Sequence, residues 1–257
     1  MRDPRTPSGE TRIDTRIPAP ATKVGVNSGP GKAAEINTRT GTQNTPDPSM
    51  SVTEPTLMPF QETKFNADTF VAEEFLKLKE KFKVEVAIEL GSAVGGTTKW
   101  LGENFDEVHT IEIMENFLEF TKKRCIGLSN ISFHLGSTVD KLAGVLSVSV
   151  PEGSNDSVLG SNMLIFIDSH WNTLPIFDEL KIIKASGLKP VIVIHDFLVP
   201  GEPKLGYDSY EGVDISFENI KKFIDDIYGE EGYEYHYNSD ATSTEIKRGL
   251  IYIYPKK

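Results

Sequence analysis

The chain of 257 residues is 38% hydrophobic and 25% charged, an ordinary globular composition, and its formal net charge of −11 argues against a general nucleic-acid binder. No apolar run approaches the roughly 18 residues of a membrane helix, and the N-terminal region lacks the apolar segment of a secretory signal. The single cysteine, Cys125, excludes an intrachain disulfide and a metal site of paired cysteines. We therefore expect a cytoplasmic protein. From the charge and the absence of a long apolar run, we expect neither a nucleic-acid nor a membrane partner.

Residues 1–56 differ from the rest of the chain. They contain no Phe, Tyr or Trp, hold eight of the 15 prolines, and carry seven basic and six acidic residues. Such a segment cannot bury enough apolar surface to offset the conformational entropy lost on folding. We therefore expect a disordered tail over residues 1–56 and one domain over residues 57–257. The tail is either a tether or docking arm, or an extension that precedes a start at Met50.

The domain begins with a helical pattern and continues as short apolar runs. In residues 66–82 the apolar side chains recur at helical spacing, which predicts an amphipathic helix. Five apolar runs follow and predict strands at residues 84–90, 107–113, 131–135, 162–168 and 190–196. Helical patterns separate these runs, and strands that are apolar on both faces and alternate with helices indicate a covered parallel sheet. The polar segment 151–162 predicts a surface loop.

The last part of the domain departs from this alternation. Residues 216–228 predict a helix, and residues 233–237 and 249–255 predict two strands joined by a stretch too short for a crossover helix. The two strands should therefore pair antiparallel. The sequence predicts an α/β fold with a Rossmann-like, mostly parallel sheet of seven strands, an antiparallel last strand, and helices on both faces.

Three glycines follow the first predicted strand, and a ligand is expected to lie against this turn. A P-loop is disfavoured because Lys99 follows a threonine instead of preceding one. A dinucleotide site is weakened because Ala93 stands where its second glycine belongs. The pattern that remains, Glu89-x-Gly91-x-x-x-Gly95, suits a cofactor with an amino-acid end and no phosphate. Its glycines would let the backbone approach that cofactor closely.

A second carboxylate, Glu112, ends the next predicted strand. It lies about where a β-α-β nucleotide site places the acceptor for ribose hydroxyls. At these motifs the chain resembles the class I S-adenosylmethionine-dependent methyltransferases. The similar stretches are IELGSAVGG (88–96), HTIEI (109–113), FHLGSTVDKL (133–142), FIDSHW (166–171) and VIVIHDF (191–197). The resemblance covers about residues 66–257 and implies S-adenosylmethionine as the cofactor. The residues it implies at the cofactor are Glu89, Gly91, Ser92, Gly95, Glu112, Ser137, Asp168 and Trp171.

Within this family, the nearest likeness is to small-molecule O-methyltransferases of the catechol, caffeoyl-CoA and sugar type. Amino-methylating DNA enzymes carry an Asp/Asn-Pro-Pro-Tyr/Trp element after the fourth strand, where this chain has DSHW at 168–171. In the small-molecule enzymes, strand-end carboxylates hold Mg²⁺, which positions and acidifies a substrate hydroxyl. Asp168 and Asp196 occupy those strand ends here. However, His195-Asp196 replaces the family's Asp-Asn, which puts the metal and its identity in doubt.

Two mechanisms stay open at these strand ends. Asp168 and Asp196 would repel each other unless they share a cation or a proton, and no Lys or Arg is predicted between them, so a divalent metal is one answer. Mg²⁺ prefers oxygen ligands, whereas His195 would favour Mn²⁺, Fe²⁺ or Zn²⁺. The other answer is metal-free, with His195 or His170 as the general base, because imidazole titrates near neutral pH. The remaining histidines lie inside predicted strands and are interpreted as structural: His109, His134 and His236.

The segment 198–212 is long for a strand–helix loop and carries Tyr207, Asp208 and Tyr210. Long loops in compact domains are often lids. This loop follows the fifth predicted strand, so it is either a lid over the methyl-transfer site or a solvated surface loop.

The sequence therefore favours methyl transfer from S-adenosylmethionine to a hydroxyl of a small polar molecule, with or without a divalent metal. The expected partner is a small hydroxylated substrate, and a homo-oligomer is left open. The alternative is a catalytically silent, methyltransferase-like binding or scaffold protein. An NAD-dependent oxidoreductase is a third hypothesis, weakened by Ala93.

Overall fold

The structure is a computed structural model that describes residues 64–149, 162–170, 173–242 and 247–256. These residues all belong to one compact unit. Three sequence-based predictions fall outside them: the tail over residues 1–56, most of the loop at 151–162, and the role of Trp171.

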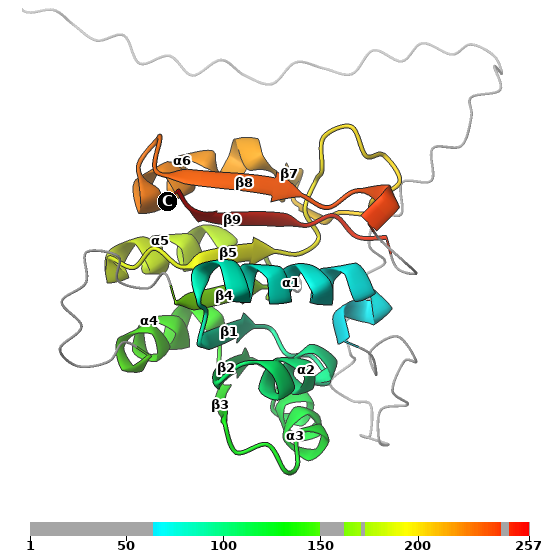
Figure 1. Ribbon diagram of the computed structural model, residues 1–257, viewed down its shortest axis with the longest axis vertical. Coiled ribbons are helices and arrows are strands. Elements are labelled where there is room, and N and C mark those ends of the chain that lie inside the picture. Colours follow the sequence, from blue (N-terminus) through cyan, green and yellow to red (C-terminus); the bar gives the residue numbers. More distant parts are fainter. Residues whose placement is uncertain (1–63, 150–161, 171–172, 243–246, 257) are drawn as a thin grey trace, which may run out of the picture. The chain divides into compact units, whose positions relative to one another are not determined.

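One seven-stranded sheet forms the centre of the domain (Figure 1), with the strand order β3-β2-β1-β4-β5-β9-β8. The strands are Val86–Leu90 (β1), Glu107–Glu112 (β2), Ile131–Leu135 (β3), Met163–Ile167 (β4), Val191–Ile194 (β5), Tyr233–Tyr237 (β8) and Ile251–Pro255 (β9). β1 to β5 pair in parallel, and β9 is antiparallel to both of its neighbours. This arrangement confirms the predicted mostly parallel sheet with an antiparallel last strand. The strand order is the one expected for the class I methyltransferase fold.

Helices cover both faces of the sheet, as predicted. They are Thr69–Phe82 (α1), Gly96–Asn104 (α2), Glu115–Arg124 (α3), Thr138–Val148 (α4), Ile176–Ser186 (α5) and Phe217–Tyr228 (α6). One apolar cluster packs α4, α5 and α6 against the sheet, and a second packs α1 and α2 against it. Successive residues of β4 alternate between the two clusters, with Ile165 in the first and Phe166 in the second. This two-sided burial explains why the central strands β4 and β5 are apolar at every position.

The first helix begins later than its apolar pattern suggested. Asp68 Oδ1 accepts hydrogen bonds from the backbone N–H groups of Phe70 at 3.0 Å and Val71 at 3.4 Å, which makes Asp68 the N-cap. The preceding residues Lys64–Ala67 form a 3₁₀ turn (η2). The predicted start at residue 66 is therefore wrong by three residues, because the cap and not the apolar spacing fixes where the helix begins.

The carboxyl ends of β1 and β4 mark the point where the strand order reverses. β2 and β3 lie on one side of β1, and β4 and β5 lie on the other. Chain connections leave this point in opposite directions, and ligands of open α/β sheets bind in the crevice that results. The fold therefore singles out the residues that follow β1 and β4.

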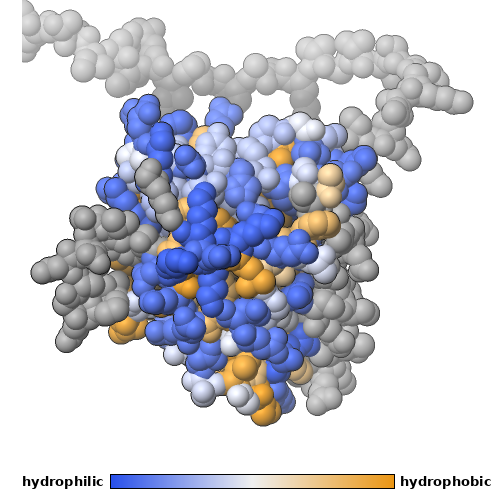
Figure 2. Space-filling view, in the orientation of Figure 1, coloured by the Kyte–Doolittle hydropathy of each residue, from blue (hydrophilic) through white to orange (hydrophobic). Residues whose placement is uncertain are grey.

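The surface is mostly polar on the face that Figure 2 shows. Hydrophilic residues cover much of it, and hydrophobic residues form small separate patches. Among the residues that the structure describes, no helix is both long and apolar enough to cross a bilayer.

Candidate active site

Asp168, His195 and Asp196 follow directly from β4 and β5 at the carboxyl edge of the sheet. Their backbone continues the sheet hydrogen bonding, because the Asp168 N–H donates to the Leu90 carbonyl at 2.9 Å and the His195 N–H donates to the Ile167 carbonyl at 3.1 Å. The strand register is thus held up to the residues that carry the side chains. The predicted convergence of the two strand-end acids is what the structure shows.

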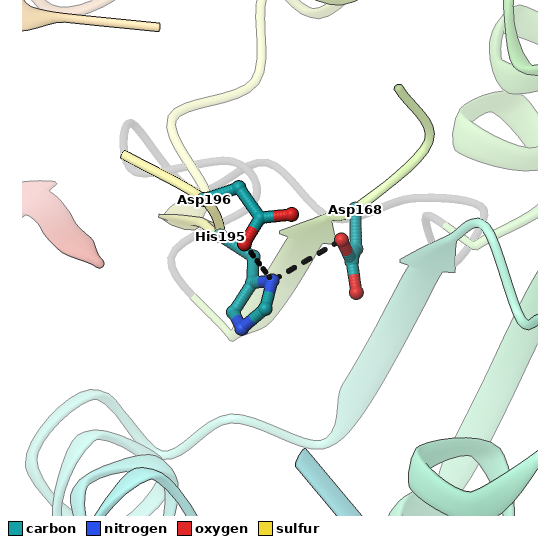
Figure 3. Close-up of side chains that lie close together, drawn as sticks. All are labelled: Asp168, His195 and Asp196. Carbon is teal, nitrogen blue, oxygen red and sulfur yellow. Dashed lines mark ion pairs between the residues drawn. The ribbon is translucent and has the colours of Figure 1, made fainter. Parts of the chain in front are cut away.

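The His195 imidazole lies between the two acids (Figure 3). Its Nδ1 atom is 3.3 Å from Asp168 Oδ1 and 3.2 Å from Asp196 Oδ1. Neither carboxylate meets hydrogen-bond geometry with the ring, so this buried Nδ1 has no hydrogen-bond partner among the described residues. Asp168 is the more accessible acid, with 32% of its side chain exposed against 13% for Asp196. The group presents one unpaired nitrogen and two carboxylate oxygens.

A second histidine, His170, shares Asp196. His170 Nε2 lies 2.8 Å from Asp196 Oδ2 in hydrogen-bond geometry. The same nitrogen is 3.8 Å from Asp168 Oδ1 and 3.7 Å from Asp208 Oδ2. The Tyr210 hydroxyl donates to the His170 carbonyl at 3.0 Å. Three carboxylates therefore surround one buried imidazole.

Arg248 supplies a positive charge that the sequence did not reveal. It comes from the connection between β8 and β9, where its Nε donates to Asp196 Oδ1 and its Nη2 donates to Asp208 Oδ1. The expectation that no basic side chain would support these acids is wrong. Arg248 stands 52 positions after Asp196 in the chain, and only the pairing of β9 with β5 brings the two together.

The charges of this group shift one another's pKa. Burial alone would lower the pKa of His195, but the carboxylates of Asp196 and Asp168 outweigh burial and raise it well above its usual value. Burial also works against the charged form of His170, and its hydrogen bond to Asp196 raises its pKa nonetheless. Burial would raise the pKa of Asp196, yet the two histidines hold it well below its usual range. A histidine held in its charged form can neither accept a proton nor ligate a metal, so His195 has to lose a proton first in either mechanism.

Asp168, His195 and Asp196 fit a divalent metal ion. Each offers one ligand atom, and the three atoms lie within 4.8 Å of one another. The unpaired Nδ1 supports this fit, because a buried polar atom without a partner is destabilising unless something binds it. One imidazole nitrogen with two carboxylate oxygens suits Mn²⁺, Fe²⁺ or Zn²⁺ better than Mg²⁺. A second group around His170 has similar spacing and shares Asp196 with the first. Asp196 is already bonded to Arg248 and His170, so a metal in either group would have to displace one of these contacts.

The two predicted cofactor glycines each have a reason within the fold. Gly91 and Gly95 have φ values of 92° and 80°, which side chains rarely adopt. A Cβ on Gly91 would lie 2.4 Å from the backbone oxygen of Asp168, and a Cβ on Gly95 would lie 2.7 Å from Thr121 Cα. Gly91 thus lets the turn pass the end of β4, and Gly95 lets α2 pack closely on α3.

Glu112 ties the glycine turn to the end of β2. Its Oε2 accepts from the Ser92 N–H at 3.2 Å and the Ala93 N–H at 2.9 Å, and its Oε1 accepts from the Met114 N–H at 2.9 Å. Burial raises the pKa of Glu112, although these hydrogen bonds oppose the shift. A ribose that bound to Glu112 would compete with the backbone amides of the turn.

Glu89, the third predicted cofactor acid, is buried beneath the turn. Its Oε2 accepts hydrogen bonds from the hydroxyls of Thr98 at 2.5 Å and Thr110 at 2.7 Å. Burial raises the pKa of Glu89 to about 8, although the hydrogen bonds from the two threonines act to lower it. Glu89 is therefore mainly uncharged near neutral pH.

Ser137, predicted near the adenine, is the N-cap of α4. Its hydroxyl oxygen accepts from the Asp140 N–H at 3.2 Å and donates to Asp140 Oδ2 at 2.8 Å. Beside it, large apolar side chains are exposed just after β2 and at the end of β3, notably Ile113 and Leu135. This edge of the sheet therefore offers apolar surface next to Glu112.

The three histidines interpreted as structural make contacts inside the fold. His109 Nδ1 lies 3.0 Å from His134 Nε2 across the β2–β3 pair. The ring of His236 stacks on Tyr252 with a centroid separation of 4.8 Å. These contacts support the structural interpretation.

The loop after β5 folds against the site. The Asp208 N–H donates to the Asp196 carbonyl at 2.9 Å, and the Ile215 N–H donates to the Asp208 carbonyl at 3.1 Å. A short hairpin of β6 (Ser209–Tyr210) and β7 (Val213–Asp214) completes the loop. Asp208 and Tyr210, two of the three residues singled out in the predicted lid, therefore contact the acid and histidine group.

A buried acid, Glu179, has no counterpart in the sequence-based prediction. It lies in the first turn of α5, where its Oε1 accepts from the hydroxyls of Thr138 and, at 2.6 Å, of Ser169. Its Oε2 is buried without a partner in the described part of the chain, and burial raises its pKa. Ser169 stands between Asp168 and His170, so Glu179 holds the turn that presents both. The helical pattern around residue 179 gave no signal of this role.

No family model matches the chain, and no curated protein matches it either. Solved structures with a similar fold include the O-methyltransferase TomG from Streptomyces achromogenes, which is involved in tomaymycin synthesis and was solved in complex with SAM. It shares 16% identity and has a TM-score of 0.48, and the match covers 73% of this chain and 80% of that chain. An O-methyltransferase from Bacillus cereus in complex with SAH has 17% identity and a TM-score of 0.45 over 72% and 81% of the two chains. An rRNA methylase from Streptococcus thermophilus has 11% identity and a TM-score of 0.43 over 71% and 97%. At these values the activity has to be argued from the site.

Proposed function

We propose that the protein transfers a methyl group from S-adenosylmethionine to a hydroxyl of a small polar molecule. The observation that carries this proposal is the contact between the glycine turn and the acid and histidine group. Gly91 lies so close to Asp168 that a Cβ would overlap the Asp168 carbonyl oxygen. A cofactor on the turn and an acceptor at Asp168 would therefore be neighbours at the switch point of the sheet.

The charges around the turn favour a cationic cofactor over a phosphorylated one. The stretch from 88 to 96 contains no Lys or Arg, and Glu112 and Asp168 lie at its two sides. Carboxylates repel a pyrophosphate and attract the sulfonium and ammonium groups of S-adenosylmethionine. The exposed apolar side chains after β2 and at the end of β3 suit the flat adenine ring. The first feature argues against NAD, whose pyrophosphate the carboxylates would repel, whereas the second suits the adenine of either cofactor.

Methyl transfer is an in-line displacement, so the protein mainly aligns the donor and the acceptor and removes the acceptor's proton. Asp168, the more exposed of the two strand-end acids, can accept a hydrogen bond from the acceptor hydroxyl and hold it toward the cofactor. His195 lies 3.3 Å from Asp168 Oδ1, and its positive charge would favour the charged form of this carboxylate. A divalent metal held by these three residues would supply a positive charge that acidifies a bound hydroxyl.

Calorimetric titration with S-adenosylmethionine, S-adenosylhomocysteine and NAD tests the cofactor. Ile113 is 62% exposed at the end of β2, so Ile113→Asp should leave the fold intact. We expect it to weaken S-adenosylmethionine binding by about tenfold, equivalent to about 1.4 kcal/mol. Ile126→Asp, at a residue that is 82% exposed elsewhere on the surface, is the matched control. Binding of NAD alone, or equal affinity in both variants, would contradict the proposed cofactor site.

One observation favours the catalytically silent alternative. Asp196 and Glu112 already have protein partners, namely Arg248 and His170 for the first and backbone amides for the second. A scaffold protein would bind S-adenosylmethionine yet release no S-adenosylhomocysteine with any hydroxylated acceptor. Mass spectrometry of S-adenosylhomocysteine formation separates the two functions.

A further inference from the structure

A cavity of about 540 Å³ lies beside the loop that follows β5. This volume is within the range of small-molecule binding sites. One wall is the loop from Leu198 to Tyr207, and the other is formed by Asp214 and the first residues of α6. The cavity therefore lies between the predicted lid and a helix.

Backbone hydrogen bonds hold the walls of this cavity in place. The Leu198 N–H donates to the Ile215 carbonyl at 2.7 Å, which joins the loop to the start of α6. The Gly206 N–H donates to the Lys247 carbonyl at 2.7 Å, which joins the same loop to the segment before β9. The cavity is thus preformed, and a ligand would not have to order it on binding.

The lining of the cavity selects a neutral ligand with hydroxyl groups. Its polar side chains include the carboxylates of Glu202, Asp214 and Glu218, which accept hydrogen bonds from hydroxyls, and none of its lining residues is basic. The rest of the lining is mainly apolar, so a phosphate, a nucleotide or a coenzyme A thioester would meet three carboxylates there and no compensating positive charge. The aromatic ring of Tyr207, 42% exposed, lines the same space. An aromatic face beside acceptor carboxylates matches a sugar ring, which has one apolar face and a rim of hydroxyl donors.

The cavity and the candidate active site share one loop. Tyr207 lines the cavity, and the next residue, Asp208, accepts from Arg248 and lies 3.7 Å from His170 Nε2. At the other end of the loop, Leu198 follows Asp196 by two positions. A ligand in the cavity would therefore contact the same segment that closes the acid and histidine group.

We propose that this cavity binds the sugar ring of a neutral glycoside, with Tyr207 stacking on its apolar face. That the glycoside is also the methyl acceptor rests on the proposed function. The binding of the glycoside in this cavity does not depend on that function.

Saturation-transfer NMR on the full chain without S-adenosylmethionine tests the binding. The probes are the methyl glycosides of glucose, galactose and rhamnose, with coenzyme A as a competitor. We expect at least one glycoside to receive saturation at its ring protons. The signal should fall about fivefold to tenfold in Tyr207→Ala, which loses the aromatic contact, and should persist in Phe70→Ala, whose ring is 38% exposed on α1. Glu218→Gln, a second change in the lining, should also weaken it.

Three outcomes would overturn the proposal: no glycoside shows transfer, the signal is unchanged in Tyr207→Ala, or coenzyme A displaces the glycoside. The failure of the proposed function looks different. In that case a glycoside binds and depends on Tyr207, but its hydroxyls are not methylated when S-adenosylmethionine is added. Methylation of other acceptors by a protein that binds no glycoside would support the proposed function and refute this cavity assignment.

Discussion

His195 Nδ1 lies 3.3 Å from Asp168 Oδ1, yet the two atoms are not in hydrogen-bond geometry. The two residues extend neighbouring parallel strands, so the sheet itself fixes their separation. A buried nitrogen and a carboxylate oxygen at this distance can serve as ligands to one cation.

The first prediction concerns metal binding by the unmodified protein. We expect calorimetry to show tighter binding of Mn²⁺ or Co²⁺ than of Mg²⁺, because the three ligand atoms include an imidazole nitrogen. His195→Gln and Asp168→Asn should each weaken the binding by about tenfold or more, and bound Co²⁺ should lose its visible absorption in His195→Gln. His236→Gln, which changes a histidine outside the group, should bind as the wild type does. A preference for Mg²⁺ that is unaffected by His195→Gln would show that the nitrogen is not a ligand.

The second prediction concerns Arg248, which pairs with Asp196 and Asp208. Arg248→Met removes the guanidinium that joins Asp196 to Asp208 and leaves only the two histidines beside these carboxylates, so it should lower the free energy of unfolding by about 2 to 3 kcal/mol. This is less than the loss for a fully buried pair, because the Arg248 side chain is 26% exposed. Hydrogen exchange should accelerate in residues 206–214, the part of the loop that Arg248 holds. Lys247→Met, which breaks a surface pair with Asp240, should cost under about 1 kcal/mol and leave that exchange unchanged. Equal effects of the two substitutions would mean that Arg248 does not anchor the loop.

The third prediction follows from the raised pKa of Glu89, about 8 in the folded protein against a usual value of 4.5. Between these two pH values the folded protein keeps a proton that the unfolded chain has lost. The stability of the wild type should therefore fall as the pH rises through this window. Glu89→Gln removes the ionisation and keeps an oxygen to accept from Thr98 and Thr110. Relative to the wild type, the variant should gain a few kcal/mol of unfolding free energy between pH 5 and pH 8.

Urea unfolding at several pH values measures this difference. Glu73→Gln, at an exposed position on α1, is the control and should show no such trend. Parallel stability curves for Glu89→Gln and the wild type would mean that Glu89 is charged in the folded state at neutral pH.

The fourth prediction separates two reasons why a turn requires glycine: the positive φ of the backbone, and the lack of space for a Cβ. Gly187→Ala, at φ 75° with open space around the new Cβ, should cost only the backbone strain of about 1 to 2 kcal/mol. Gly91→Ala adds the overlap with the Asp168 carbonyl and should cost clearly more, measured as the fall in unfolding free energy. A similar cost at both positions would show that the turn can move away from β4. A large cost at Gly91 would also mean that a variant there reports on folding before it reports on cofactor binding.

The sequence predicted the sheet well because its central strands β1, β4 and β5 are buried on both faces and largely apolar. Runs such as residues 163–167 have few other ways to be buried, and the alternation with helices leaves a parallel sheet as the natural arrangement. The convergence of Asp168 and Asp196 followed from that topology, since the carboxyl ends of parallel strands meet at one edge. These parts of the site could be predicted because they depend on strand order alone.

Other parts of the site depend on contacts that local patterns do not encode. Arg248 reaches Asp196 across 52 positions through the pairing of β9 with β5, and a polar residue between two strands gave no hint of that partner. Glu179 looks like an ordinary polar residue in the first turn of a helix, and its burial depends on how α4 and α5 pack together. The start of α1 was misplaced for a similar reason, because the N-cap at Asp68 makes the helix begin three residues later than predicted.

The position of β9 between β5 and β8 makes β9 the only link between β8 and the rest of the sheet. β8 precedes β9 in the chain but pairs only with it, so β8 is part of the sheet only when β9 is docked on β5. Arg248 stands just before β9 and reaches Asp196 only with that docking. A folding intermediate that has β1 to β5 in place would already hold Asp168, His195 and Asp196 in register, without the cation that closes the loop over them. Local opening of the β8–β9 pair would return the native protein to that state, so the closing of the site is coupled to the stability of the last strand.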